Sequence, residues 1–217
     1  MPLEKQRQPL SRRRALHFAA GAPKGAKPKS RKVGAFLSGL AVRRHTLAVA
    51  AIQASIRSPD RLEGALARAE NLASMLMLLD KVQACGGHKD ICLFPVVPLP
   101  EDAMPALLQA ARRHNCTIVY GSEGLTRNGA ILRLTTTVPP NGDIRIDHAA
   151  MEDASVLKLR TRNGVYRAVA CAADAWYPGQ AGMTTAIHSP DGRAIVATYS
   201  RGEQAIAAVL HVADTSS

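Results

Sequence analysis

The sequence predicts an α/β fold, and two observations lead to this prediction. Residues 47–121 alternate apolar runs typical of strands with segments whose apolar residues recur every three to four positions, which is typical of helices. Residues 130–212 instead contain short β-branched runs separated by Asn-Gly and Asp-Gly turns, which predicts hairpins. The apolar fraction of 47% in 217 residues is ordinary for a globular protein with one core.

The first strand and the helix after it have clear boundaries. Residues 47–53 form a run without charge, which predicts a strand buried on both faces. Ser58-Pro59-Asp60 predicts a helix start, because proline suits the first helical turn. Leucines then recur at the spacing of one helix face until Gly86-Gly87 ends the helix, and residues 91–94 form the second strand.

Residues 98–121 continue this alternation. Glu101-Asp102 stand at the start of a second helix, where carboxylates favour the positive end of the helix dipole, and residues 104–114 continue it. Residues 116–121 form the third strand. The order β-α-β-α-β predicts parallel neighbouring strands joined by crossover helices.

The second half is predicted to be rich in strands and partly antiparallel. Its two hairpin turns are Pro139-Pro140-Asn141-Gly142 and Ser189-Pro190-Asp191-Gly192. The predicted strands of this half are residues 130–138, 144–146, 165–171, 183–188, 193–199 and 205–212.

The net charge of +11 belongs to one end of the chain. Residues 1–44 hold twelve Lys and Arg and one Glu, whereas residues 45–217 hold sixteen basic and sixteen acidic residues. The composition of residues 1–44 predicts a basic, mostly disordered tail, followed by one domain over residues 45–217. A nucleic-acid partner is not expected, except through the tail.

Three features bear on the compartment. The four cysteines are widely spaced, which favours reduced thiols and a cytoplasmic location. Ser11-Arg12-Arg13-Arg14 resembles the opening of a twin-arginine export signal, but Pro23-Lys24 interrupts the apolar run that such a signal needs. Export therefore stays the alternative. No apolar run reaches the roughly 20 residues of a membrane span.

Several segments follow one another in an order that resembles a known family. They are Val49-Ala-Ala-Ile-Gln53, Ala69-Glu-Asn-Leu-Ala73, Lys89-Asp-Ile-Cys-Leu-Phe-Pro95, Ile118-Val-Tyr-Gly-Ser122, Pro140-Asn-Gly142 and the hairpin Gly182-Met-Thr-Thr-Ala-Ile-His-Ser-Pro-Asp-Gly192. This set resembles the carbon–nitrogen hydrolase superfamily of nitrilases and aliphatic amidases. The resemblance implies an α-β-β-α sandwich, here incomplete because a central strand and helix are missing, and a homo-oligomer.

The same resemblance implies a reaction at a cysteine, a glutamate and a lysine. In the family the glutamate follows the Phe-Pro directly, but this chain has Val96 there. Glu101 is the nearest candidate base, although a helix-start acid explains it as well. The lysine is missing after the Asn-Gly turn, and Lys158, the next lysine, is explained by a solvated surface.

Cys171 is the candidate nucleophile, and two alignments differ about it. In the first, Cys171 with Asp174 and Trp176-Tyr177-Pro178 resembles the family's strand–Cys–x–Asp–aromatic–Pro elbow, with one extra residue before the aspartate. In the second, residues 159–166 resemble a later family segment in which an Arg-bearing helix leads to a Val-Tyr strand. Cys171 is then an ordinary buried cysteine.

These residues leave two hypotheses. The first is a hydrolase of nitriles or amides with impaired or lost activity; if it is active, Cys171 is the nucleophile and Glu101 the base. The alternative is a non-catalytic interaction protein whose basic tail binds an acidic partner or nucleic acid. No cofactor is expected, and the irregular spacing of Cys85, His88 and Cys92 predicts no metal site.

Overall fold

The computed structural model describes residues 18–20, 34–37, 40–43, 46–58, 64–125, 131–148, 154–161, 164–175 and 184–212. The strands are β1 (Phe18–Ala20), β2 (Gly34–Leu37), β3 (Leu40–Arg43), β4 (Thr46–Gln53), β5 (Ile91–Val96), β6 (Thr117–Leu125), β7 (Ile131–Val138), β8 (Arg145–His148), β9 (Ala154–Thr161), β10 (Gly164–Cys171), β11 (Ala186–His188), β12 (Ala194–Ala197) and β13 (Gln204–His211). The helices are α1 (Gly64–Ala84), α2 (Met104–His114) and the short 3₁₀ helix η1 (Ala173–Ala175).

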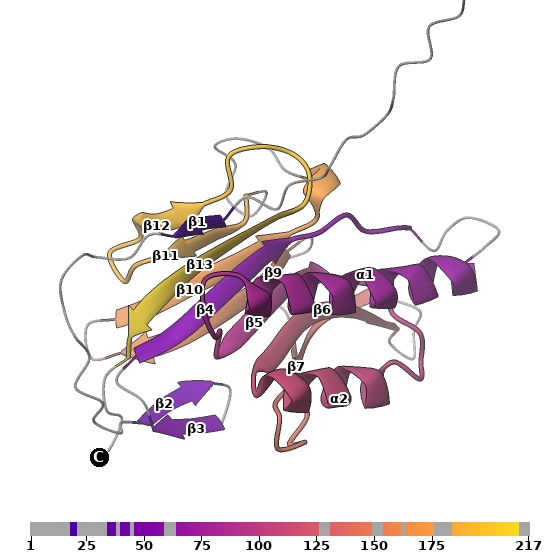
Figure 1. The fold of residues 1–217 in the computed structure, drawn as a ribbon, viewed down its shortest axis with the longest axis horizontal. Coiled ribbons are helices and arrows are strands. Elements are labelled where there is room, and N and C mark those ends of the chain that lie inside the picture. The colour runs from indigo at the N-terminus through magenta and orange to yellow at the C-terminus, as the bar shows by residue number, and fades with distance from the viewer. Residues whose placement is uncertain are drawn as a thin grey trace, which may run out of the picture.

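A seven-stranded sheet forms the centre of the fold, in the order β1-β13-β4-β5-β6-β7-β8. Strands β4, β5 and β6 run parallel, as the β-α-β-α-β pattern predicts, and α1 and α2 are their crossover connections. Strand β13 adds to β4 and β7 adds to β6, both antiparallel. Figure 1 shows both helices on the same face of this sheet.

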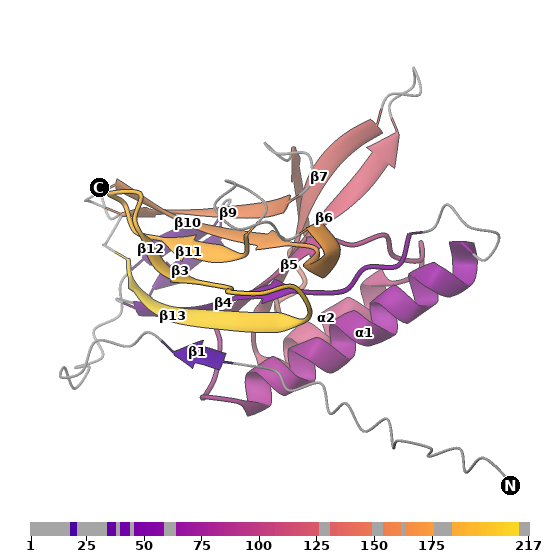
Figure 2. The ribbon, with the colours of Figure 1, turned by 90° about the horizontal axis from the view of Figure 1, so that it is seen from above.

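A four-stranded antiparallel sheet, in the order β12-β11-β10-β9, packs against the other face of the large sheet, as Figure 2 shows. One apolar core lies between the helices and the large sheet, around Phe94, Leu78 and Leu107. A second core lies between the two sheets and includes Val49 and Leu159. Strand β4 supplies residues to both cores, which explains why its run of residues carries no charge.

Asn71 fixes helix α1 to the loops at the end of the parallel strands. Its side chain is buried, its Oδ1 accepts the Arg57 N–H at 2.9 Å, and its Nδ2 donates to the carbonyls of Arg57 and Pro98 at 3.0 and 3.1 Å. A buried amide needs this full set of partners. Asn71 therefore holds in place the segments that follow β4 and β5.

The strands and helices predicted for residues 47–121 are confirmed in type and in order. The second half of the chain needs one correction. Residues 159–161 belong to strand β9 and not to a helix, so the Arg-bearing helix of the second alignment is wrong. The burial of β9 alternates, with Leu157 and Leu159 inside and Lys158 and Arg160 exposed, which is the period of a strand. The predicted helix start at Pro59 lies outside the described residues.

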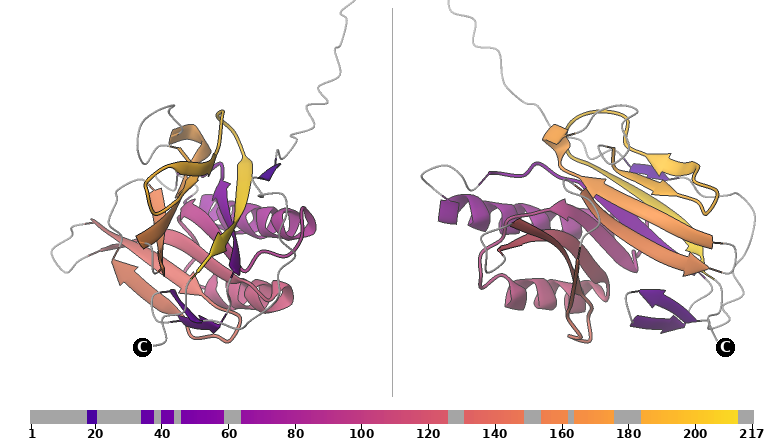
Figure 3. Two further views of the ribbon diagram at one scale, coloured as in Figure 1. Left: turned by 90° about the vertical axis from the view of Figure 1, so that its left-hand side faces the viewer. Right: turned by 180° about the vertical axis from the view of Figure 1, so that it is seen from behind.

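The described part of the chain has three layers: helices, large sheet, small sheet. Both of its α-helices cover the large sheet, so no described helix covers the outer face of the four-stranded sheet, which is seen from behind in Figure 3. This matches the prediction of an incomplete α-β-β-α sandwich. Most of residues 1–44 and the candidate export signal lie outside the described residues, so the disordered tail stays a prediction.

Candidate functional site

The carboxyl ends of the parallel strands meet the small sheet at one edge of the inter-sheet space. Gln53 ends β4, and Val96 ends β5 beside Gly121 of β6. From the small sheet, Ala172 bridges Ala54, which places the end of β10 against the end of β4. This edge is where α/β sheets commonly bind their ligands.

Cys171 lies at this edge as the last residue of β10, and Ala172 separates it from η1. Its side chain is fully buried (0% exposed), its N–H donates to Thr185 Oγ1 at 3.0 Å, and its Sγ lies 3.3 Å from the same oxygen. The thiol also donates to Gln53 Oε1 at 3.7 Å. Burial raises the pKa of the Cys171 thiol, and the hydrogen bonds from Thr185 offset only part of this shift.

The thiol therefore has only neutral hydrogen-bond partners among the described residues. A nucleophilic cysteine is normally activated by a neighbouring base or cation that lowers its pKa. In this structure the shift has the opposite sign, so little thiolate is present near neutral pH.

Gln53 connects Cys171 to residues 198–202, the segment that joins β12 of the small sheet to β13 of the large sheet. Its Nε2 donates to the carbonyls of Ser200 and Gly202 at 2.9 and 2.8 Å, and its Oε1 accepts Thr198 Oγ1 at 2.8 Å. The side chain is 0% exposed, so these bonds replace all contact with water. This role could not be predicted from the sequence, in which Gln53 is only a polar residue at the end of an apolar strand.

Val96 occupies the position at which the family's glutamate is expected. A Cβ atom on Gly121 would lie 2.6 Å from Val96 Cγ2 and 2.7 Å from Ser155 Oγ, so both side chains converge on the same point. Ser155 Oγ is buried without a hydrogen-bond partner among the described residues. At this position the described side chains are an apolar one and an unsatisfied hydroxyl, and none of them is a carboxylate.

Replacing Ser155 by alanine is expected to leave the free energy of unfolding unchanged or raise it by up to about 1 kcal/mol. The hydroxyl makes no hydrogen bond to lose, and its removal ends the cost of burying it. Urea unfolding of both proteins measures the difference. A loss of about 1.5 kcal/mol or more would contradict this prediction, because it is the loss expected of a satisfied hydroxyl.

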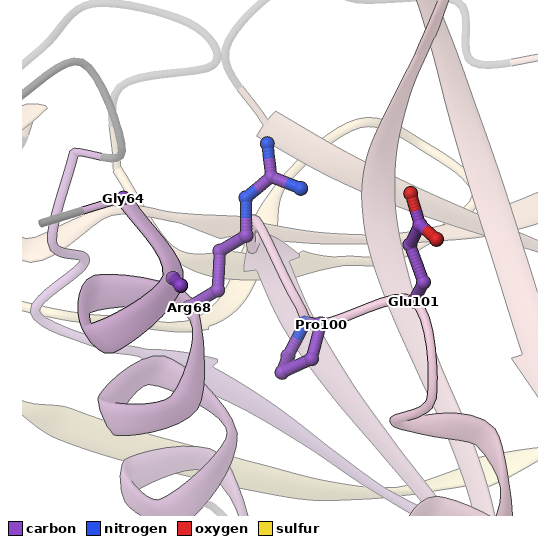
Figure 4. Close-up of a pocket in the computed structure, with 5 residues that line it drawn as sticks. Gly64, Arg68, Pro100 and Glu101 are labelled. Carbon is purple, nitrogen blue, oxygen red and sulfur yellow. The ribbon is translucent and has the colours of Figure 1, made fainter.

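The other predicted site residues lie on the surface. Glu101 is exposed and lines a hollow of about 390 Å³ together with Gly64, Ala65, Arg68 and Pro100. Figure 4 shows the side chains of Arg68, from α1, and Glu101, from the loop before α2, extending in the same direction with Pro100 between them. Lys158 is exposed on β9. Neither Glu101 nor Lys158 is a hydrogen-bond partner of Cys171, and Trp176-Tyr177-Pro178 lies outside the described residues.

Comparisons with known proteins gave solved structures only. No family model and no curated protein matches the chain. Similar solved structures include an N-terminal amidase (13% identity, 58% of this chain and 39% of that chain, TM-score 0.39). A carbon-nitrogen hydrolase from Helicobacter pylori G27 (9%, 49% and 40%, 0.40) and XC1258 from Xanthomonas campestris, a CN-hydrolase superfamily protein (16%, 52% and 49%, 0.35), are also similar.

Members of the carbon–nitrogen hydrolase superfamily, which the sequence resembles, are thus among the solved structures similar to this chain. The similarity is partial, since the matched part spans only about two-fifths to one half of the length of those chains. Among the described residues, no group of three His, Cys, Asp or Glu could hold a metal ion, and no helix is long and apolar enough to span a membrane.

Proposed function

We propose that this chain is a shortened carbon–nitrogen-hydrolase-like protein in which hydrolysis of nitriles or amides is lost or strongly impaired. The observation that carries the proposal is the environment of Cys171. Its thiol is buried, its pKa is raised, and its hydrogen-bond partners Thr185 and Gln53 are neutral. Val96, which cannot accept a proton, stands where the base is expected.

Thiol labelling of the native protein tests this proposal, because the chain contains its own control. Cys85 is exposed, whereas Cys92, Cys116 and Cys171 are buried. We expect iodoacetamide to modify Cys85 first and Cys171 only after unfolding, since the thiolate is the reactive form and burial disfavours it. Mass spectrometry of peptides after timed labelling gives the order. Labelling of Cys171 ahead of Cys85 at neutral pH would overturn the proposal.

Turnover gives the second measurement. Ammonia release from a panel of nitriles and amides is expected to be the same for the native protein and for Cys171→Ala. Hydrolysis that disappears in Cys171→Ala would instead support an active hydrolase of non-peptide C–N bonds. In that alternative Cys171 is the nucleophile and Glu101, which lines a hollow of ligand size, is the base.

The concentration of positive charge in residues 1–44 supports an interaction role as the companion of lost hydrolysis. In this role the tail binds an acidic partner or nucleic acid. An affinity for polyanions that falls steeply with salt, and that is lost when residues 1–44 are removed, would support it. A weak dependence on salt would speak against it.

A further inference from the structure

Strand β8 forms one edge of the seven-stranded sheet. Among the described strands it pairs only with β7, so no described strand pairs with the N–H and C=O groups on its other side. Figure 2 shows that the end of the sheet at β6 and β7 projects beyond the helices and the small sheet. A further strand can add to an edge of this kind through main-chain hydrogen bonds.

The side chains of β8 alternate in chemical character. Arg145 and Asp147 point to one face of the sheet, and Ile146, between them, points to the other. Ile146 is a large apolar residue that is 60% exposed. Asp147 is also exposed and makes no ion pair with the described residues. The edge strand thus carries an aliphatic side chain and a carboxylate that the described part of the chain leaves uncovered.

This order of side chains is complementary to itself. When two copies of β8 pair antiparallel about a twofold axis at Ile146, Arg145 of each copy lies directly opposite Asp147 of the other. The two Ile146 side chains then face each other at the axis. Opposite charges and aliphatic side chains in directly opposed positions stabilise a pair of strands.

The same charges disfavour the neighbouring registers. The axis must pass through a residue, because directly opposed residues point their backbone groups either both toward the partner strand or both away from it. An axis at Arg145 would place two guanidinium groups opposite each other, and an axis at Asp147 would place two carboxylates opposite each other. Like charges in these positions are destabilising, so the sequence of β8 selects the axis at Ile146.

An ion pair that Arg145 makes within the chain is compatible with this pairing. Its Nη2 donates to Asp143 Oδ2 at 3.0 Å. A guanidinium group has five N–H donors, so Arg145 can bind Asp143 and Asp147 of a second copy at the same time.

We propose that the edge strand β8 binds β8 of a second copy of this chain, antiparallel about a twofold axis at Ile146, and joins the two seven-stranded sheets. Main-chain hydrogen bonds hold the strands together, and the two pairs of Arg145 with Asp147 fix the register. Each strand has four residues, so the interface is small and a weak dimer is expected. The inference does not depend on whether Cys171 reacts.

Sedimentation equilibrium of the full chain at concentrations up to about 0.5 mM tests the proposal. We expect the native protein to be in equilibrium between monomer and dimer. Asp147→Arg is expected to raise the dissociation constant of the dimer at least about tenfold, because it places arginines opposite each other. The control Asp102→Arg makes the same change of net charge at an exposed position before α2 and should alter this constant by less than about twofold.

A mixture of two charge variants tests the register. Arg145→Asp and Asp147→Arg each place like charges opposite each other in their own dimers, whereas in a mixed dimer the two carboxylates of one strand face the two guanidinium groups of the other. We expect the mixture to dimerise within about threefold of the native protein, although neither variant does so alone. A native protein that stays monomeric, equal losses in Asp147→Arg and Asp102→Arg, or no recovery in the mixture would overturn the proposal.

A cross-link tests the same geometry without a charge reversal. In a Cys85→Ser background, which removes the exposed thiol, Ile146→Cys places two thiols at the axis with Cβ atoms about 5.5 Å apart or less. Oxidation is expected to link two copies of this variant but not of Val209→Cys, whose position on β13 is 50% exposed. Equal linking of both variants, or of neither, would overturn the proposal. Circular dichroism verifies that each variant is folded.

Discussion

Replacing Gly121 by alanine is expected to lower the free energy of unfolding by about 3 kcal/mol, the upper range for overpacking a buried position. The added Cβ would lie 2.6 Å from Val96 Cγ2, 2.7 Å from Ser155 Oγ and 3.0 Å from Val96 Cα. The last of these atoms is backbone, so rotation of a side chain cannot remove the clash. Urea unfolding of the native protein and of Gly121→Ala measures the loss.

The neighbouring side chains provide the control for this prediction. The loss on Gly121→Ala should shrink by about 1 kcal/mol when Ser155 is already alanine, because one of the close contacts is gone. It should not vanish, since the contacts with Val96 remain. A loss below about 0.5 kcal/mol would show that the backbone at Val96 and the small sheet shift easily to accept the methyl group, and a loss independent of Ser155 would show that the clash is with Val96 alone.

The parallel strands that end at this edge could be predicted from the sequence alone. The uncharged runs of β4, β5 and β6 and the helical spacing between them were sufficient to predict three parallel strands, and the structure confirms them. These elements are defined by local periodicity. Val96, which follows Phe94-Pro95 in the sequence, is the last residue of β5.

Strand β9 and the partners of Cys171 could not be predicted in this way. Lys158 and Arg160 allow a surface helix as well as a strand, and only the pairing of β9 with β10 decides between them. Thr185 lies 14 residues from Cys171 in sequence and meets it when β11 pairs with β10, whereas Gln53 lies 118 residues away and meets it only after the two sheets pack together. Long-range contacts of this kind leave no periodic signal in one sequence.

Replacing Gln53 by leucine is expected to cost about 3 to 4 kcal/mol, a value typical of a broken buried hydrogen-bond network. The volume is similar, so no large cavity forms. The carbonyl of Gly202 loses its side-chain donor, the carbonyl of Ser200 keeps Gln204 Nε2 as a donor, and the hydroxyl of Thr198 loses the shorter of its two hydrogen bonds. Differential urea unfolding against the native chain gives the loss.

Gln109→Leu is the matched control, because Gln109 is exposed on helix α2 and the same change there should alter stability by less than about 0.5 kcal/mol. If Gln53→Leu costs no more than this control, the network does not hold residues 198–202 against β4. If it costs the expected amount and also exposes Cys171 to iodoacetamide, then Gln53 keeps the thiol buried. The residue that joins the two sheets at this edge would then also be the one that keeps the cysteine unreactive.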